Sequence, residues 1–532
     1  MKDNLTIHAA ALTLLAALAI PFGLKAQVTD KQDHAGKPHH YQLVDLGSTL
    51  GGPQSYLNPG SGLDFGFTST LSRGGIVVGF ADTSLSDPFP AFCFWDCDVV
   101  HAFRADKGGD LTDLGALPGG GSSVPTWIAP NGLVAGVSEN GETDPLYAGL
   151  PQLRAVLWQD NNIIDLGTLP EGGYQSAANA VNSAGQVVGA ALNTIPDANS
   201  MQSNELTFWL WGGIMPPYEY QTRAFLWDRL VGMQDLGALP GGTDAQAFFI
   251  NDQGQVVGLS YTRSTQSGAC FPLATRSFLW ERGKGMTDLG SLGGTCTVAA
   301  DLNNKGQVVG ESDRTGDQSA PAFLWEHGSI RELGGSFGGD FAGALAINDQ
   351  GAIVGFGYLA GNATFHAALW NTVHNITDLG VLGDDQCSYA AGINLHGQIV
   401  GSSIPVCDSD PSTFRAFLWE DGSLFDLNSL VPSNSPLYLQ VVQNINERGE
   451  IAGTGADVSG NQYAFLLIPC DENHPDVDGC DYSMMEANAA PRESSMSTMH
   501  QPTIARRALG PFGRRGSAFI PGRIGALNPA GR

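Results

Sequence analysis

The sequence predicts an all-β protein, a β-propeller of repeated four-stranded blades, and three observations lead to this prediction. Three short motifs recur in a fixed order eight times between residues 41 and 469. The repeating unit is roughly 50 residues long, in the range of propeller blades. The chain also has 70 Gly and only 15% charged residues. That composition is typical of short strands joined by turns rather than of long helices.

The first motif is an acidic residue followed by Leu and usually Gly, expected at the end of the last strand of each blade. Its copies begin at Asp45, Asp113, Asp165, Asp235, Asp288, Glu332, Asp378 and Asp426. A cation site is one hypothesis for these carboxylates. Because they belong to different blades, they cannot converge on one ion at the roughly 2.3–2.6 Å that calcium requires. We therefore expect each Asp to accept N–H groups of the turn that follows.

The second motif is a hairpin such as "INDQGQVVG", which begins at Ile250. Its copies end at Gly79, Gly136, Gly189, Gly258, Gly310, Gly355, Gly401 and Gly453. Six copies contain Asn-x-x-Gly, the arrangement of a type I turn followed by a glycine at positive φ. Ser72 and Ala129 stand in place of the Asn in the first two units. We assign these Asn residues to turn formation and not to ligand binding.

The third motif is "FLW" or a variant of it. Its tryptophans are Trp95, Trp158, Trp227, Trp280, Trp325, Trp370 and Trp419, and the eighth copy, "AFLLI" from Ala464, has none. A large apolar ring at this position is expected to act as a wedge between adjacent sheets. The alternative is an exposed platform for a ligand.

The two ends of the repeat region predict how the ring closes. Each unit contains a small-residue strand, expected nearest the axis, then the "GQVVG", "AFLW" and "DLG" strands. The chain opens with a lone last strand, "YQLVDLG" from Tyr41, and its final repeat stops after "AFLLIP". The first strand can therefore complete the last sheet, and stacking such sheets radially buries both of their faces. We predict eight blades; seven blades with one unit outside the ring is the alternative. A kelch-like ring is disfavoured because the Gly pairs here follow DLG.

These motifs resemble a known family. The order "AFLW…DLG.LGG…A.AIN..GQVVG" is similar to the HAF-type repeat of bacterial proteins described as probable extracellular repeat proteins. The resemblance covers nearly all of residues 41–469, and the segment "LIPCDENHPDVDGCDYSM" also resembles the terminus of acidobacterial members. The resemblance implies export and repeats. It implies no established activity and supplies no catalytic residues.

Net charge limits the classes of partner. The formal net charge is −27. Nucleic-acid binders need a basic surface to displace phosphate counterions, so the chain is not expected to bind nucleic acid. The same charge argues against docking on an anionic membrane.

The two ends of the chain differ from the repeats. Residues 1–26, with Lys2 and an apolar run over 9–20, predict a signal peptide cut after Ala26, with an uncleaved anchor as the alternative. No later segment is apolar for about 18 residues, so no transmembrane span is expected in the mature chain. Residues 482–532 carry seven Arg and predict a disordered basic tail, either a solvated end or a segment that binds an acidic surface.

Eight cysteines fit an exported protein. Their order predicts four local disulfides, Cys93–Cys97, Cys270–Cys296, Cys387–Cys407 and Cys470–Cys480. There is no CxxC pair and no zinc-finger spacing of His, so we expect no metal and no cofactor. Residues 470–481 are acidic and bracketed by Cys470 and Cys480, which predicts a disulfide-closed cap on the last blade. Calcium binding by this segment is the alternative, although it lacks the EF-hand pattern.

One insertion is the candidate ligand site. Between Gly189 and Phe225 the chain is about twice as long as the matching loops, and it contains an aromatic cluster, Phe208, Trp209, Trp211, Tyr218 and Tyr220. Loops after "GQVVG" and after DLG emerge on one face of a propeller, the loop-rich face. Aromatic residues on such loops suit a sugar or protein ligand. The alternative is that they pack on their own propeller as a lid.

The sequence contains no catalytic motif. It has no G-x-S-x-G elbow, H-E-x-x-H helix or P-loop. We therefore predict a secreted, periplasmic or cell-surface protein, expected to be a monomer, that binds a carbohydrate or an extracellular protein. An enzyme acting on polysaccharide, with an acidic pair assembled near the axis, is one alternative. A purely structural surface protein is the other.

Overall fold

The computed structural model describes residues 40–471, His474 and Cys480, apart from residues 48–49, 58–68, 89–97, 147–148, 161, 171, 201–219, 263–272, 335, 373–374 and 408. Several predictions fall on other residues. The signal peptide, the basic tail, Cys93, Cys97, Cys270, Trp95, Phe208, Trp209, Trp211 and Tyr218 lie outside the described residues. No helix among the described residues is long and apolar enough to cross a membrane.

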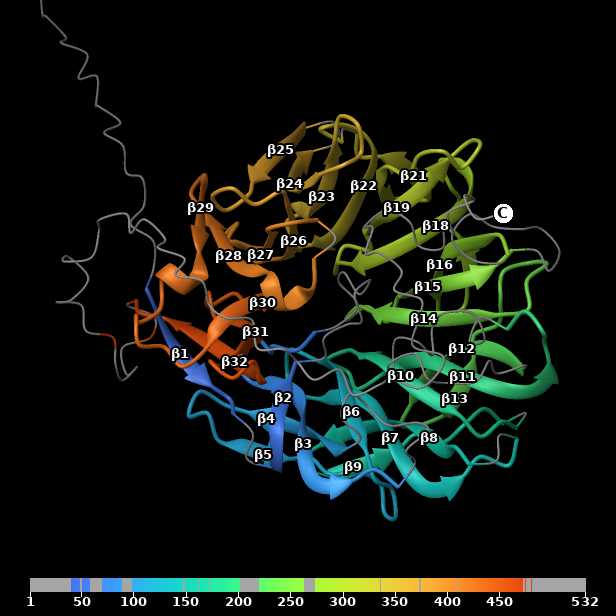
Figure 1. Ribbon diagram of the computed structural model, residues 1–532. Coiled ribbons are helices and arrows are strands. Elements are labelled where there is room, and N and C mark those ends of the chain that lie inside the picture. Colours follow the sequence, from blue (N-terminus) through green and yellow to red (C-terminus); the bar gives the residue numbers. More distant parts are fainter. Residues whose placement is uncertain are drawn as a thin grey trace, which may run out of the picture. The chain divides into compact units, whose positions relative to one another are not determined.

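The described residues form eight four-stranded antiparallel units, here called blades 1 to 8, that follow one another in a ring (Figure 1). Blade 1 contains β2 (Gly51–Tyr56), β3 (Val77–Ser86), β4 (Asp98–Ala105) and β5 (Leu111–Asp113), and blade 2 contains β6 (Ser123–Ile128), β7 (Val134–Thr143), β8 (Pro151–Gln159) and β9 (Asn162–Asp165). Blade 3 contains β10 (Ser176–Val181), β11 (Val187–Pro196), β12 (Tyr220–Asp228) and β13 (Gly232–Asp235), and blade 4 contains β14 (Ala245–Ile250), β15 (Val256–Tyr261), β16 (Thr275–Glu281) and β17 (Gly285–Asp288).

Blades 5 to 8 are built in the same way. Blade 5 contains β18 (Gly293–Leu302), β19 (Val308–Arg314), β20 (Ala322–Glu326) and β21 (Ser329–Glu332), and blade 6 contains β22 (Gly338–Ile347), β23 (Ile353–Leu359), β24 (Phe365–Thr372) and β25 (Asn375–Gly380). Blade 7 contains β26 (Cys387–Ile393), β27 (Ile399–Ile404), β28 (Arg415–Glu420) and β29 (Ser423–Asp426), and blade 8 contains β30 (Tyr438–Ile445), β31 (Ile451–Ala456), β32 (Gln462–Pro469) and β1 (Tyr41–Asp45). Two 3-10 turns, η2 (Pro411–Thr413) and η3 (Leu427–Ser429), lie in the connections around β28 and β29.

Ring closure follows the prediction. The N-terminal strand β1 pairs antiparallel with β32, from Tyr41 opposite Pro469 to Asp45 opposite Phe465, and supplies the missing fourth strand of blade 8. The first strands of successive blades contact one another, for example β18 with β22 and β22 with β26, which places them nearest the axis. Blades 4 and 5 also share one parallel pair, Thr275 with Cys296, so the eight blades form seven hydrogen-bonded sheets.

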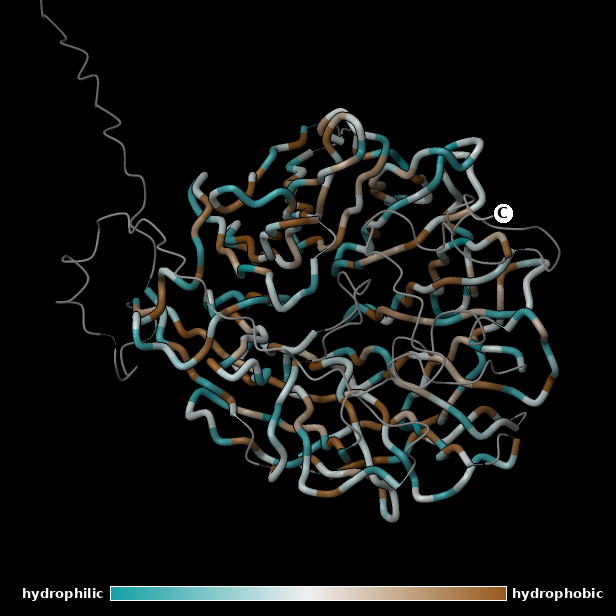
Figure 2. Tube along the Cα trace, viewed as in Figure 1, coloured by the Kyte–Doolittle hydropathy of each residue, from teal (hydrophilic) through white to brown (hydrophobic). Residues whose placement is uncertain are grey.

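The core is divided among the junctions between blades. One apolar cluster, for example, joins Val309 and Leu324 of blade 5 to Ala344 and Trp370 of blade 6. Along the trace, apolar stretches are interrupted by hydrophilic residues, many of them in the turns (Figure 2). Each blade therefore buries both faces against its neighbours, as a four-stranded sheet of small and β-branched residues requires.

The Asn of the hairpin motif has a second role beyond its turn. In blade 5 the Asn303 side-chain oxygen accepts the N–H groups of Lys305 and Gln307, both at 3.0 Å. Its Nδ2 donates to the main-chain oxygen of Asn348 in the next blade, at 3.1 Å. The same bond to the following blade is made by Asn182, Asn251, Asn348, Asn394 and Asn446. The six Asn residues thus form a ladder that ties successive blades together.

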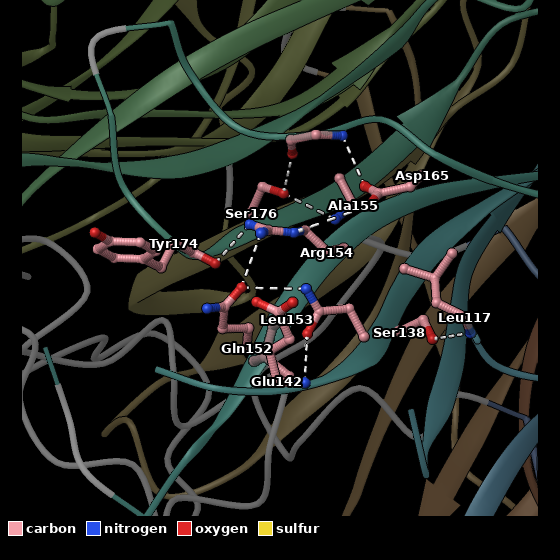
Figure 3. A network of polar contacts seen from close by, with 12 residues as sticks. Leu117, Ser138, Glu142, Gln152, Leu153, Arg154, Ala155, Asp165, Tyr174 and Ser176 are labelled. Atoms are coloured by element: carbon pink, nitrogen blue, oxygen red, sulfur yellow. Dashed lines mark hydrogen bonds and ion pairs between the residues drawn. The ribbon is translucent and has the colours of Figure 1, made fainter. Parts of the chain in front are cut away.

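The DLG acids behave as expected. Asp165 Oδ1 accepts the N–H of Gly167 at 2.8 Å, and the same bond forms at Asp45, Asp113, Asp235, Asp288 and Asp378. Figure 3 shows how this end of blade 2 is held: Arg154, near Asp165, donates from Nη1 to the carbonyl oxygen of Tyr174 at 2.7 Å. Within the described residues no group of three or more His, Cys, Asp or Glu side chains is arranged to hold a metal ion.

The predicted wedge role of the Trp is confirmed in four blades. Trp158, Trp227, Trp325 and Trp370 are at least nine-tenths buried. Trp158 and Trp370 also donate their indole N–H to a carbonyl oxygen at the end of the preceding blade, that of Leu114 at 3.0 Å and that of Gly334 at 3.1 Å. Trp280 and Trp419 are only partly buried.

The assignment of Trp95 to this motif was wrong. In the other Trp-bearing blades, the first apolar residue of the hairpin's second strand lies opposite the Trp, as Val134 does opposite Trp158. In blade 1 the corresponding Val77 lies opposite Ala105, so β4 (Asp98–Ala105) is the third strand. The sequence "HAFRA" there lacks the bulky residue by which the motif was identified.

Two of the predicted disulfides are present among the described residues. Cys387 is bonded to Cys407, and Cys470 to Cys480. Cys296 is also disulfide-bonded, while its predicted partner lies outside the described residues. Disulfides persist in oxidising environments, so these bonds indicate an extracytoplasmic compartment.

Candidate functional site

A pocket of about 570 Å³ lies at the junction of blades 6, 7 and 8. It is lined by the turns β22–β23, β26–β27, β28–β29 and β30–β31, by the end of β24, and by the segment after β32. Because strands alternate in direction, these turns share the face that carries the Asn ladder, which we call the Asn-turn face. The volume of the pocket is in the range of small-molecule sites, roughly 300–1,000 Å³.

The location differs from the predicted one. Loops after "GQVVG" and DLG emerge on the opposite, loop-rich face, where the aromatic insertion was placed. Of that cluster only Tyr220 lies among the described residues, where it begins β12 and is partly buried. The insertion therefore stays a prediction, and the pocket is a site that the sequence argument missed.

Two substitutions in blade 6 explain why the pocket exists. In blade 5, Gln307 lies just before the second strand and donates to Glu326, just after the Trp, at 2.8 Å. Blades 4 and 7 contain the same pair, Gln255 with Glu281 and Gln398 with Glu420. In blade 6 these two positions are occupied by Ala352 and Asn371. Their side chains are shorter, and both line the pocket.

The surroundings of the turn glycines show the space that is left where blade 6 has Ala352 in place of Gln. A β-carbon on Gly351 would lie 3.5 Å from Gln307 Oε1 of the preceding blade, and one on Gly449 would lie 3.3 Å from Gln398 Oε1. Gly397 is the equivalent glycine of blade 7, and the blade before it is blade 6. A β-carbon on Gly397 would meet nothing within 4 Å. The absence of one side chain thus opens the junction between blades 6 and 7.

Trp419 is the aromatic residue that this opening exposes. It projects from β28 towards blade 6 and packs with Leu369, Leu379 and Leu382 of that blade. It also lines the pocket and is partly exposed, whereas Trp370 at the preceding junction is fully buried. A partly exposed indole offers a flat apolar surface with a polar edge.

Carboxylates line the same pocket, and two of them are held in place by hydrogen bonds to neighbouring turns. Glu420 accepts a bond from Gln398 Nε2 at 2.7 Å, and Gln398 Oε1 accepts one from Asn394 at 2.7 Å. Glu447, from the next blade, accepts the main-chain N–H of Leu395 at 2.8 Å. Such bonds fix the carboxylates before any ligand arrives, which lowers the entropy lost on binding.

The cap after β32 supplies the remaining wall. Asp471 lines the pocket, and its Oδ1 lies 2.7 Å from Nδ1 of the buried His474. On the other side of His474, Nε2 is 3.4 Å from Oε1 of the fully buried Glu450, which also pairs with Lys107 at 2.5 Å. Asp471 and His474, which follow β32, are therefore held by polar contacts that lead to the buried Glu450.

Tyr41 lies opposite Pro469 in the pairing of β1 with β32, and Pro469 lines the pocket. The Tyr41 side chain is 1% exposed, and its hydroxyl has no hydrogen-bond partner. Burial raises the pKa of this hydroxyl, and the charges of Glu420 and Asp471 raise it further. The hydroxyl therefore stays protonated and available as a donor.

Among the described residues, the four carboxyl groups whose pKa values are raised to about 6 or 7 do not line the pocket. Burial raises the pKa of Glu139 and Glu311 to about 7, and that of Asp301 and Asp313 to about 6. Glu139 accepts the N–H groups of two loop residues, and Asp301 accepts that of Ile347 in the next blade at 2.8 Å. These two acids hold main chain in place.

Aromatic rings, and not acids, meet between the first strands of blades 2 and 4. The ring centroids of Trp127 in β6 and Phe249 in β14 are 6.2 Å apart, in an edge-to-face arrangement. These strands are not neighbours in the ring, so the contact lies on the axial side of blade 3. The enzyme alternative requires an acidic pair near the axis, and this contact consists of two aromatic rings instead.

Comparison with known proteins assigns neither a family nor an activity to this chain. No protein-family model matches the chain, and no curated protein matches it. Among solved structures it is similar to the β-propeller domain of the Trilobed protease from Pyrococcus furiosus (10% identity, TM-score 0.37, covering 63% of this chain and 91% of that one). It is also similar to the acylaminoacyl peptidase of Pyrococcus horikoshii (8%, 0.40, 75% and 59%) and to TolB from Acinetobacter baumannii (11%, 0.28, 74% and 79%). The strand topology above establishes this chain as a β-propeller.

Proposed function

We propose that this chain is an exported, non-enzymatic β-propeller that binds a carbohydrate in the pocket around Trp419, and that it belongs with the HAF-type repeat proteins whose motif order it carries. The observation that supports binding is the partly exposed indole in a pocket of about 570 Å³. Sugar rings present apolar C–H faces and polar rims. A flat aromatic surface bordered by amides and carboxylates matches both.

The polar groups of the pocket suit hydroxyl recognition. Asn348, Gln350 and Asn371 bring amides from blade 6, and Glu420 and Glu447 bring carboxylates from blades 7 and 8. Amides donate and accept, and carboxylates accept, so together they can satisfy the mixed donor and acceptor character of sugar hydroxyls. Export is supported by the disulfides and by the predicted signal peptide.

A glycan-array screen tests this function. The protein beginning at Gln27 is compared with Trp419→Ala and with Trp280→Ala, the matched control in blade 4, which is also partly buried but lies outside the pocket. We expect wild type and the control to bind the same glycans and Trp419→Ala to lose them. Equal binding by wild type and Trp419→Ala would contradict the proposed site. Release of reducing sugar from a bound glycan would replace the binder with the enzyme alternative.

A further inference from the structure

The junction that closes the ring, between blades 8 and 1, departs from the repeat at one turn position. Just before the second strand, blades 4, 5 and 7 have a glutamine: Gln255, Gln307 and Gln398. Blade 8 has Glu450 there, and its side chain is 0% exposed. Oε1 of Glu450 lies 2.5 Å from Nζ of Lys107, which belongs to the β4–β5 turn of blade 1. A lysine amine therefore meets a buried carboxylate where the first and last blades join.

The other oxygen of this carboxylate binds the ladder residue of blade 8, Asn446. Asn446 Nδ2 donates to Glu450 Oε2 at 2.6 Å. Asn446 Oδ1 accepts the main-chain N–H groups of Arg448 at 2.9 Å and of Glu450 at 3.1 Å. The amine of Lys107 and the carboxamide of Asn446 thus contact the two oxygens of one buried carboxylate, and the amide oxygen already faces two N–H donors.

The turn of blade 1 leaves room for the lysine beside this carboxylate. A β-carbon on Gly75 would lie 2.5 Å from Glu450 Oε2 and 2.9 Å from Lys107 Cε. A glycine avoids both contacts, and it also suits the positive φ of 83° at this position. The end of the Lys107 side chain and the oxygen that binds Asn446 therefore border the same small space.

Blade 7 contains the same turn without the acid and the amine. Asn394 Oδ1 accepts the N–H groups of His396 at 3.0 Å and of Gln398 at 3.1 Å, so its carboxamide is held in the same way. Its Nδ2 donates to Gln398 Oε1 at 2.7 Å, where blade 8 has a carboxylate. An amide oxygen is a far weaker base than a carboxylate. The turn alone thus supplies the N–H donors, and blade 8 adds the base and the nucleophile that a reaction needs.

We propose that Lys107 and Asn446 form an isopeptide bond that closes the ring covalently. Glu450 takes a proton from the Lys107 ammonium group, and the free amine attacks Cγ of Asn446. The N–H groups of Arg448 and Glu450 stabilise the negative charge that develops on Oδ1, as in an oxyanion hole. Glu450 then passes a proton to Nδ2, with which it already shares a hydrogen bond.

The atoms of this step balance without an oxidant or any other reactant. The bond from Cγ to Nδ2 breaks as the bond from Cγ to Lys107 Nζ forms. Of the three protons on the lysine ammonium, one stays on the new amide and two depart with Nδ2 as an ammonium ion. Glu450 ends as the carboxylate that it was at the start. The new bond joins blade 1 to blade 8, beside the strand pairing of β1 with β32, and does not depend on the proposed binding of a carbohydrate.

Tryptic peptide mapping of the protein beginning at Gln27 tests this bond. Trypsin does not cleave after a lysine whose amine is acylated. We therefore expect one linked species that joins residues 105–154 to residues 416–448, lighter than the two peptides together by one ammonia molecule. Intact mass alone is not sufficient, because an N-terminal Gln27 can also lose ammonia by cyclising.

Two variants separate the reaction from the ion pair. Glu450→Gln gives blade 8 the residue that blades 4, 5 and 7 carry, so the turn is kept and the base is lost. Lys107→Arg keeps the positive charge, but a guanidinium cannot be deprotonated in a protein and is no nucleophile. We expect both variants to release residues 108–154 and residues 416–448 as separate peptides.

The remaining outcomes each overturn a stated part of the inference. Separate release of residues 108–154 and 416–448 from the wild type would overturn the isopeptide bond and leave Glu450 as an ion-pair partner only. A linked species in Glu450→Gln would overturn the role of Glu450 as the base. Fragmentation of the linked species that places the bond on Asn444, in the same peptide, would overturn the assignment to Asn446.

Discussion

The junction between blades 5 and 6 and the junction between blades 6 and 7 are built from the same repeat, and only one of them holds a pocket. At the first, Gln307 donates to Glu326, and the tryptophan of the next blade, Trp370, is 0% exposed. At the second, the corresponding positions hold Ala352 and Asn371, and Trp419 is partly exposed. Two shorter side chains in blade 6 therefore accompany the pocket at the second junction.

The backbone around the two junctions does not differ in kind. Asn303 bonds to the main chain of Asn348 at 3.1 Å across the first junction, and Asn348 bonds to that of Asn394 at 2.9 Å across the second. The ladder holds the blades at both places. The repeat can thus vary its covering side chains without loosening the ring, because the bonds between blades come from other positions.

Replacing each tryptophan should give the largest difference between the junctions. Trp370→Ala removes a fully buried side chain and its bond to Gly334, and should lower the free energy of unfolding by about 3–5 kcal/mol. Trp419→Ala, which loses less buried area, should cost less than half of that. Thermal unfolding of both variants checks this. A larger loss for Trp419→Ala would mean that it is a core residue and that the pocket is not open.

Removing the ladder bond should have a smaller effect, equal at both junctions. Asn303→Ala and Asn348→Ala each lose the turn bonds and the bond to the next blade, and we expect about 1–3 kcal/mol of destabilisation for each. Chemical unfolding of the two variants gives the comparison. A much smaller loss for Asn348→Ala would show that the open junction depends less on the ladder. Blade 2, with Ala129 in place of Asn, is the natural control.

Closing the pocket should weaken binding without loss of stability. Ala352→Gln with Asn371→Glu restores the pair found in blade 5, and the space at Gly397 can receive the longer side chain. We expect affinity for the glycan identified on the array to fall at least about tenfold, or about 1.4 kcal/mol. The mirror-image variant, Gln307→Ala with Glu326→Asn, should expose Trp370 to quenching by acrylamide. Unchanged affinity in the first variant would place the ligand elsewhere.

A last prediction concerns pH and the closed junction. Glu311 lies on the same face of β19 as Val309, which packs against blade 6, and burial raises its pKa from 4.5 to about 7. A carboxyl group whose pKa is raised by folding stabilises the folded state below its unfolded pKa, and this contribution is lost as pH rises through the folded value. Stability should therefore fall between about pH 4.5 and pH 7, and Glu311→Gln should flatten that slope in thermal unfolding. An unchanged slope would show that Glu311 does not titrate in this range. Phe356 holds the corresponding position in blade 6, so no such group faces blade 7 there.

Much of the fold followed from the sequence. The three motifs gave the number of blades, and the lone "YQLVDLG" strand gave the closure through β1 and β32. The bonds of Asp165 and its counterparts to the glycine two residues on were also expected, since they are local. Blade 1 was misassigned at Trp95 because its true third strand has Ala105 where other blades have a bulky residue.

The candidate site did not follow from the sequence, although its signal was present. "NDQGAIVG" and "ALWN" depart from the repeat at Ala352 and Asn371, and both departures occur in the same blade. Without a structure they are two unrelated changes. In the ring they meet at one junction, opposite a tryptophan from the next blade.

The sequence by itself determined the repeat and the turns, because each depends on residues that are close together along the chain. It also determined the closure of the ring, because the last repeat lacks a fourth strand and the chain begins with one. Only the tertiary structure decided which side chains of neighbouring blades meet. The pocket is lined by residues of three blades and of the segment after β32, among them Ala352, Trp419, Glu447 and Asp471. These residues meet only because of how the sheets pack. A binding site of this kind is a property of the junction, since no single repeat contains enough of it to be recognised.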